Sequence, residues 1–89
     1  MVEKVVTVKN RAGIHARPAG MIVTLANKFE SQIFIEKEDD KINAKSIMGV
    51  MMLAAGKGAV VTLEADGADE RECFDALLEL INNKFGEGE

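Results

Sequence analysis

Tryptophan and tyrosine are absent from this chain of 89 residues, and four phenylalanines are its only aromatic side chains. Eleven lysines and arginines stand against fifteen aspartates and glutamates, so the formal net charge is −4. Proteins that bind nucleic acids usually present basic patches or aromatic rings on which bases stack. Both features are scarce here, so we expect protein partners and no direct contact with nucleic acid.

Cysteine and histidine each occur once, as Cys73 and His15. A single cysteine cannot form an internal disulfide, and the two residues cannot supply the four ligands of a structural zinc site. No apolar run reaches the roughly 18 residues that cross a membrane, and charges interrupt the apolar N-terminus. We therefore expect a cytoplasmic, monomeric, single-domain protein over residues 1–89, with no metal, no cofactor and no membrane contact.

The hydrophobic pattern predicts four strands. The β-branched residues 2–9 and the alternating residues 59–66 are each typical of a strand. Residues 32–46 alternate on both sides of an Asp39-Asp40 turn, which predicts a hairpin and hence a sheet that is at least partly antiparallel.

Two long helices are predicted from apolar residues at steps of three and four. The first covers residues 16–29. The second begins at Asp69, with Glu72 completing a capping box, and its apolar stripe extends to Phe85. Two such helices can cover one face of the sheet only, so we expect the other face to meet water. The strand charges expected on that face are Glu36, Glu38, Lys41 and Glu64.

A short helix is predicted between an N-cap at Ser46 and a closing glycine at Gly56. Met52 and Leu53 are expected to be its inward residues. A short surface helix that is apolar nearly all round cannot bury every side, so an exposed patch should remain near His15 and dock partners. The residues expected in this patch are Ile47, Met48 and Met51.

The only histidine lies in the stretch "NRAGIHARPAG", residues 10–20, between a glycine and the only proline. Gly13 and Pro18 indicate a loop that turns into a helix, with His15 at the helix start. Unpaired amides and the helix dipole favour an anion there. A neutral imidazole is a nucleophile, and a phosphoryl group on it would meet the backbone amides of Ala16 and Arg17 and the Arg17 guanidinium. The alternative is that His15 is a polar cap and Arg17 a solvated cation.

Two motifs resemble those of a known family. "GIHARPAG" resembles the active-site signature of the histidine-containing phosphocarrier (HPr) family of the phosphoenolpyruvate-dependent sugar phosphotransferase system, and "AKSIMGVMMLAA" resembles its serine-containing signature. The resemblance covers essentially the whole chain. It implies an α+β fold, an open-faced β-sandwich of four antiparallel strands covered on one face by three helices in the order βαββαβα.

The resemblance also implies a function. The matched histidine, His15, would accept phosphate on Nδ1 from phosphorylated enzyme I and pass it to enzyme IIA domains for sugar uptake, with Arg17 assisting. Such a protein is a carrier within a relay, with no turnover of its own.

The serine motif resembles the version found in Gram-positive bacteria. There the residue matched by Ser46 is phosphorylated by an ATP-dependent serine kinase, and the phosphorylated residue creates binding to a catabolite control transcription factor. The expected regulatory partners are therefore this kinase, a phosphorylase and that transcription factor. A dianion at Ser46 beside an apolar docking patch would inhibit transfer from enzyme I. Ser46 can be an N-cap and a regulatory site at once.

Two rival functions remain. One is a signalling module that acts through Ser46 alone, against which the presence of His15 argues. The other is a small ligand-binding regulatory domain in which His15 contacts a bound anion. Within the phosphotransferase family, the serine motif favours sugar uptake over the nitrogen-related branch.

Overall fold

The computed structural model describes residues 1–9, 13–53 and 56–86. Within these ranges the chain forms four strands, three α-helices and a final 3-10 turn. In chain order they are β1 (Val2–Thr7), α1 (Ala16–Ala26), β2 (Gln32–Lys37), β3 (Asp40–Asn43), α2 (Ile47–Met52), β4 (Val60–Asp66), α3 (Glu70–Asn82) and the turn Lys84–Gly86.

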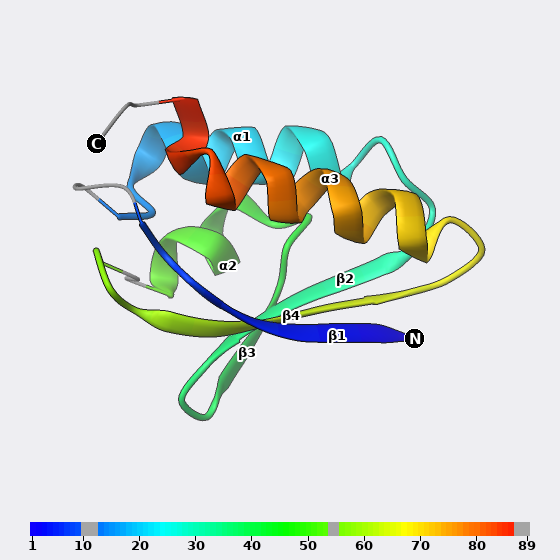
Figure 1. Cartoon of the computed structure of the whole chain (residues 1–89), viewed down its shortest axis with the longest axis horizontal. Helices are drawn as coiled ribbons and strands as arrows, with labels where there is room; N and C mark the ends of the chain where they lie inside the picture. Colours follow the sequence, from blue (N-terminus) through cyan, green and yellow to red (C-terminus); the bar gives the residue numbers. More distant parts are fainter. Residues whose placement is uncertain (10–12, 54–55, 87–89) are drawn as a thin grey trace.

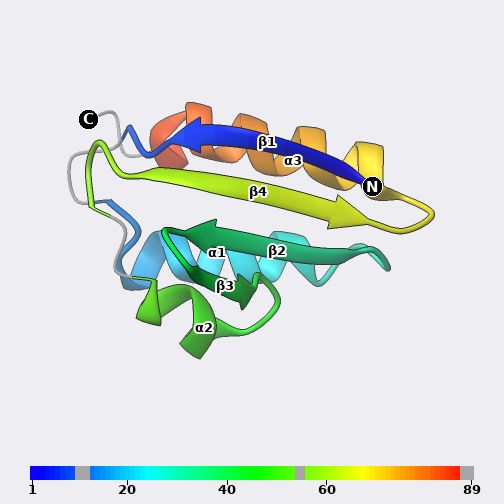
Figure 2. The same ribbon diagram turned by 90° about the horizontal axis from the view of Figure 1, so that it is seen from below.

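The strands form one antiparallel sheet in the order β1-β4-β2-β3. Figure 1 shows the helices on one side of this sheet, and Figure 2 shows the opposite face, which no helix covers. The expected open-faced α+β architecture is therefore confirmed. Because β4 pairs with both β1 and β2, the first strand of the chain lies beside the last.

The core lies between the sheet and the helices. Strands β2 and β4 alternate as predicted, so that Ile33, Ile35 and Leu63 are fully buried against the helices. Helix α1 buries Pro18, Ala19, Ile22 and Ala26, and α3 buries Cys73, Phe74, Leu77 and Ile81. The predicted apolar faces of both long helices are thus the faces that pack.

Both long helices end earlier than predicted. Helix α1 ends at Ala26, and the side-chain amide of its C-cap residue, Asn27, donates to the carbonyls of Val23 (2.9 Å) and Lys45 (3.3 Å). Helix α3 ends at Asn82. Phe85 is buried as expected, but a left-handed turn brings it into the core, with φ of 54° at both Lys84 and Phe85.

The hairpin turn lies one residue before the expected Asp39-Asp40 position. Lys37 pairs with Asp40 across the turn, so Glu38 and Asp39 are its two central residues and Asp40 already belongs to β3. Glu38 adopts a φ of 57°, as such tight hairpin turns require.

Glu64 was expected among the solvated charges of the open face, and this expectation is wrong for that residue. Glu64 lies on the open face but is 7% exposed. Lys41 Nζ on β3 lies 2.8 Å from its carboxylate and 5.4 Å from the ring centre of Phe34. On β1, which pairs with the other side of β4, Glu3 is directly opposite Glu64. Side chains from β1 and from β3, which lies beyond β2, therefore cover the charge of Glu64 on β4.

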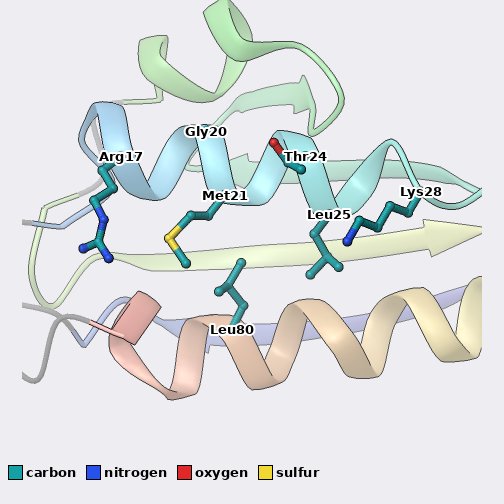
Figure 3. A pocket seen from close by; sticks show the side chains of 7 residues that line it. All are labelled: Arg17, Gly20, Met21, Thr24, Leu25, Lys28 and Leu80. Atoms are coloured by element: carbon teal, nitrogen blue, oxygen red, sulfur yellow. The ribbon is translucent and has the colours of Figure 1, made fainter.

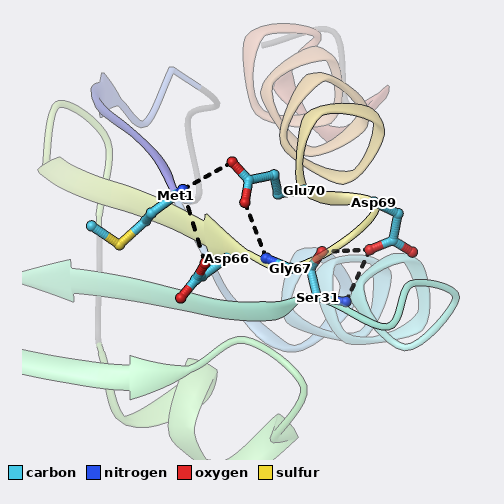
Figure 4. Close-up of polar contacts among 6 residues, drawn as sticks. All are labelled: Met1, Ser31, Asp66, Gly67, Asp69 and Glu70. Atoms are coloured by element: carbon cyan, nitrogen blue, oxygen red, sulfur yellow. Dashed lines mark hydrogen bonds and ion pairs between the residues drawn. The ribbon is translucent and has the colours of Figure 1, made fainter.

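Asp69 is the N-cap residue of α3, as predicted, but its side chain caps nothing in that helix. It reaches the loop after α1 instead, where its carboxylate accepts hydrogen bonds from the amides of Glu30 and Ser31, both at 2.9 Å, and from the Ser31 hydroxyl. The predicted capping-box role is therefore wrong. Figure 4 shows this contact between Asp69 and Ser31.

The same end of the sheet holds a close backbone approach. A Cβ built on Gly67 would lie 2.6 Å from Ser31 Oγ and 2.7 Å from Ser31 Cα. The Gly67 amide donates to Glu70 at 3.1 Å, and the Met1 amino group lies 3.0 Å from the other oxygen of that carboxylate (Figure 4). A side chain at position 67 of the β4–α3 loop would therefore collide with Ser31.

Candidate functional site

His15 is the N-cap residue of α1 and is exposed to solvent. Its backbone is extended (φ −98°, ψ −164°), and its carbonyl accepts the first helical hydrogen bond, from the amide of Ala19 at 2.9 Å. Its imidazole makes no capping hydrogen bond to the helix. His15 therefore has the position of a cap without the function of one, and this observation disfavours the alternative in which it is only a polar cap.

The residues around His15 hold it at the surface. Gly13 supplies a φ of +69° for the turn into the helix, and Ile14 is buried at 5% exposure. Pro18, in the first turn of α1, is also buried. With an apolar anchor on each side, the chain presents His15 outward. Residues 10–12, the start of the motif, lie outside the described residues.

The start of α1 has the electrostatics of an anion site. The amides of the first turn of a helix have no partner carbonyl within the helix itself, so those of Ala16 and Arg17 point toward its N-terminal end. The first turn carries no acidic residue, so no carboxylate offsets the positive end of the helix dipole. Ala16 and Arg17 are both exposed. These two residues are where the sequence places the phosphate-binding backbone.

The second motif forms α2, which contacts α1 and β3. Figures 2 and 3 show it alongside the part of α1 that follows His15. Ser46 is its N-cap, as predicted, and the Ser46 hydroxyl accepts a hydrogen bond from the amide of Gly49 at 3.2 Å. Gly49 sits close to β3, since a Cβ built there would lie 3.4 Å from Ile42 Cβ. Ser46 is exposed, so its hydroxyl can be reached from solvent.

Helix α2 is shorter and differently oriented than expected. It ends at Met52, well before Gly56, and residues 54 and 55 of the predicted helix lie outside the described ones. Val50 and Leu53 are buried, whereas Met52 is 78% exposed, so the inward assignment of Met52 is wrong. Val50 and Leu53 are three residues apart and share a helix face, while Met52 points about 160° away from Val50, at roughly 100° per residue.

The expected apolar patch is present as an exposed surface. Its three residues remain partly or largely exposed: Ile47 at 44%, Met48 at 71% and Met51 at 43%. Met52 extends it at 78%. Exposed apolar patches on small proteins commonly mark interaction surfaces.

A groove beside Arg17 was not anticipated from the sequence. It lies between α1 and α3, and its lining includes Met21, Lys28 and Leu80 (Figure 3). Leu80 lies outside the main apolar stripe of α3. That offset leucine is the one signal in the sequence that α3 has a second apolar contact.

No group of three or more metal-ligating side chains comes together among the residues that the structure describes. Within the same residues, none of the helices has the length and apolar character needed to span a lipid bilayer.

Comparison with known proteins places this geometry in a family. A family model described as the phosphorylation site of the PTS HPr component matches residues 2–83. The chain is 53% identical to the phosphocarrier protein HPr of Cupriavidus necator over 89 residues, which is the whole of both chains. This chain belongs to the HPr family. The resemblance to this family is thereby confirmed, and the phosphotransferase system is the setting of the family.

Other HPr relatives agree in fold and sequence. The HPr-like protein Crh of Halalkalibacterium halodurans is 52% identical over 84 residues, which cover 94% of this chain and all of the relative. The crystal structure of HPr from Thermoanaerobacter tengcongensis has a TM-score of 0.94 and 53% identity, and the match covers 98% of each chain. The similar proteins thus include both phosphocarriers and a Crh protein.

Proposed function

We propose that His15 accepts a phosphoryl group from phosphorylated enzyme I and passes it to enzyme IIA domains, as a cytoplasmic carrier in sugar uptake. The observation that carries the proposal is the exposed imidazole at the start of α1, in a chain that matches the HPr phosphorylation-site family. The chain adds no turnover of its own to this relay.

The transfer is a displacement at phosphorus. The lone pair of His15 Nδ1 forms the new N–P bond while the N–P bond of the donor phosphohistidine breaks, and the released electron pair returns to the donor imidazole. The product has three charged or partly charged oxygens. The outward amides of Ala16 and Arg17, the positive end of α1 and the Arg17 guanidinium offset that charge. Catalysis is then a matter of alignment and charge neutralisation.

The direct test is phosphorylation in a reconstituted system. Incubated with phosphoenolpyruvate and enzyme I, the protein should gain one acid-labile phosphate, and His15→Ala should gain none. Subsequent addition of an enzyme IIA domain should remove the phosphate from the wild-type protein. A phosphate that stays noncovalent and is lost on washing would support the rival ligand-binding domain instead.

Ser46 is the proposed regulatory site, phosphorylated by an ATP-dependent serine kinase. Its hydroxyl is exposed and sits at the N-terminus of α2, where a phosphate is electrostatically tolerated. The same phosphate would lie beside the Ile47, Met48 and Met51 patch, which we propose docks the partners. Placing a dianion next to apolar docking residues opposes their desolvation, and transfer from enzyme I should slow.

The regulatory proposal has its own test. Treatment with the kinase and ATP should add an acid-stable phosphate to the wild-type protein and none to Ser46→Ala. The modified protein should accept phosphate from enzyme I more slowly, and should gain affinity for a catabolite control transcription factor. Equal rates before and after modification would remove the regulatory role while leaving the carrier role intact.

A further inference from the structure

The sulfur atoms of this protein differ sharply in their access to solvent. The chain has one cysteine and five methionines. Cys73 is fully buried on the inner side of α3. By contrast, three methionines lie on the short helix α2 and are exposed, Met48 at 71%, Met51 at 43% and Met52 at 78%. A reagent in solution therefore meets thioether sulfur on α2 and does not meet the thiol.

The three methionines of α2 share one side of the helix. At roughly 100° per residue, positions 48, 51 and 52 fall within an arc of about 100°. Val50, which is fully buried, lies about 150° from the middle of that arc at the same rotation per residue. The methionines therefore occupy the side of α2 that faces away from the core, and their thioethers form one solvent-facing group.

Thioether sulfur reacts with a peroxide in a two-electron step. The sulfur lone pair attacks one peroxide oxygen, so that an S–O bond forms while the O–O bond breaks. The proton on the transferred oxygen passes to the departing hydroxide, which leaves as water. Sulfur is oxidised and the peroxide is reduced. The product, methionine sulfoxide, is polar, and methionine sulfoxide reductases convert it back to methionine.

We propose that Met48 and Met52 are sites of reversible oxidation by peroxides, and that their sulfoxides weaken docking at the α2 patch. The inference rests on the proposed function, which assigns partner docking to the patch of Ile47, Met48 and Met51. Met48 belongs to that patch and Met52 extends it. The two methionines most open to an oxidant therefore lie on, or directly beside, the proposed docking surface.

The polarity of the sulfoxide explains the expected effect. Docking removes water from the patch, which is favourable for an apolar thioether. A sulfoxide oxygen gives up hydrogen bonds to water and finds no donor in an apolar interface, so its burial is unfavourable. The imidazole of His15 lies on a different helix and is not changed by the reaction. Oxidation should therefore weaken association with enzyme I and leave the transfer step itself intact.

Peptide mass spectrometry identifies the oxidised residues after the folded protein has been treated with hydrogen peroxide. Met48 and Met52 should gain oxygen before Met51, and the half-buried Met21 of α1 should gain it last. Cys73 should remain a free thiol. Met1 is an internal reference, because it is 71% exposed and the N-terminus lies away from α2 in both Figure 1 and Figure 2.

Steady-state phosphorylation by enzyme I measures the consequence. Oxidation should raise the KM for this protein about tenfold, the range expected for central apolar interface residues, and leave kcat within about twofold. Methionine sulfoxide reductases for both sulfoxide epimers, with thioredoxin as reductant, should restore the original KM. Circular dichroism should show that the oxidised protein is folded, and unfolding by the treatment would overturn the proposal.

Two leucine variants locate the effect. Met48→Leu combined with Met52→Leu keeps apolar side chains and removes both sulfur atoms, so peroxide should change the KM of this variant by less than about twofold from its own untreated value. Met21→Leu retains all the sulfur of α2 and should respond as the wild-type protein does. Equal responses of the two variants would overturn the proposal, as would preferential oxidation of Met21 or Cys73.

Failure of the oxidation proposal and failure of the carrier function are separable. If the untreated protein gains no phosphate from enzyme I, the proposed function fails. If the untreated protein is phosphorylated, and the protein with sulfoxides at Met48 and Met52 has an unchanged KM, only the oxidation proposal fails.

Discussion

Arg17 occupies two environments at once, because its backbone lies in the first turn of α1 and its side chain lines the groove next to α3. An exposed cation at a helix N-terminus is mildly unfavourable to the helix by the dipole. The phosphoryl group that we propose Arg17 meets during transfer would offset this cost.

At residue scale we predict that Arg17→Ala slows phosphorylation of His15 at least about tenfold, because a charge-assisted donor to the transferring oxygens is lost. Its urea midpoint should stay close to that of the wild-type protein, since exposed charges contribute little to stability. Rapid-quench phosphorylation by enzyme I measures the rate. Arg71→Ala, which removes an exposed arginine of α3, is the matched control. A rate equal to that of the control would exclude the role of Arg17.

Gly67 allows a second residue-scale prediction. A methyl group at this position meets the backbone of Ser31, which cannot yield as a side-chain tip can. Gly67→Ala should lower the free energy of unfolding by about 1–3 kcal/mol, the usual cost of overpacking.

Gly20 is the matched control for that substitution. Gly20 lies within helix α1, and a Cβ built on it would meet no other atom within 4 Å. Gly20→Ala should therefore raise the free energy of unfolding by up to about 1 kcal/mol. Urea denaturation measures both variants. The prediction fails if the two alanines shift the midpoint in the same direction.

Asp69 illustrates what residue patterns predict and what they miss. Its place at the start of α3 follows from the sequence, because capping is a relation between residues close in the chain. Its true partners, Glu30 and Ser31, are 39 and 38 residues away, and only the packed fold brings them together. The Ser31 hydroxyl and the two amides lower the pKa of the Asp69 carboxyl. A local motif cannot reveal such a tertiary contact.

At the scale of elements, the edge strand β1 is joined to β4 through a pair of carboxyl groups. Glu3 and Glu64 are directly opposite on the open face, and Lys41 lies against Glu64. The pKa of Glu64 is lowered, chiefly by its hydrogen bond with Lys41. The pKa of Glu3 is raised, chiefly because its side chain hydrogen-bonds to Glu64, with Glu36 adding repulsion and Lys41 opposing it.

These contacts predict the effect of Glu3→Gln. A raised pKa in the folded state means that Glu3 contributes most to stability below its unfolded pKa, about 4.3, and that this contribution is lost as pH rises through the folded pKa. At pH 7 two carboxylates then face each other. Glutamine can donate to Glu64 without a bound proton, so Glu3→Gln should be more stable than the wild-type protein at pH 7. The difference should shrink as the pH falls to 4.

Urea midpoints at several pH values test this prediction. Glu30→Gln, which neutralises an exposed glutamate in the loop after α1, is the control for the change in net charge. An identical gain in the two variants would show that the effect comes from overall charge and not from the contact between β1 and β4.

The order and type of the elements could be predicted, because periods of two and of three to four residues directly reflect which face is buried. Their ends could not. Helix α1 ends where Asn27 finds the carbonyl of Lys45, and Phe85 enters the core through a left-handed turn that no apolar period describes. Asn27 and Lys45 are 18 residues apart in the chain, so neighbouring residues alone do not predict their contact.

At the scale of the whole molecule, helices on one face of the sheet leave Cys73 fully buried on the inner side of α3. Burial, with a smaller contribution from the charge of Asp69, raises the pKa of its thiol to about 11 from an ordinary value of 9.0. A pKa raised by about two units leaves roughly a hundredfold less thiolate near neutrality, and the thiolate is the reactive form.

We therefore predict that Cys73 reacts with a thiol reagent at pH 8 at least about a hundredfold more slowly in the folded protein than in concentrated urea. Absorbance of the released aromatic thiol from Ellman's reagent measures the rate. A Cys73→Ala protein carrying Ala68→Cys, at an exposed loop position, is the control and should react at similar rates in both conditions. Rapid labelling of native Cys73 would contradict the burial of this helix face.

The candidate site was predictable only where it depends on residues that are close in the sequence. His15, Arg17 and Ser46 belong to short motifs, and their placement at helix starts follows from neighbouring residues. The α1–α3 groove joins Met21 to Leu80, and no local pattern relates two residues so far apart. Surfaces of that kind become visible only when the helices are packed together.

The pairing of β1 with β4 also affects when this edge of the sheet can form. Val2 lies opposite Ala65 and Thr7 opposite Val60, so β1 has no partner in β4 until more than fifty further residues have been made. Contacts that distant along the chain close slowly. This edge of the sheet therefore forms only after β4 has been made, and a nascent chain stalled before Val60 would lack the strand that pairs with β1.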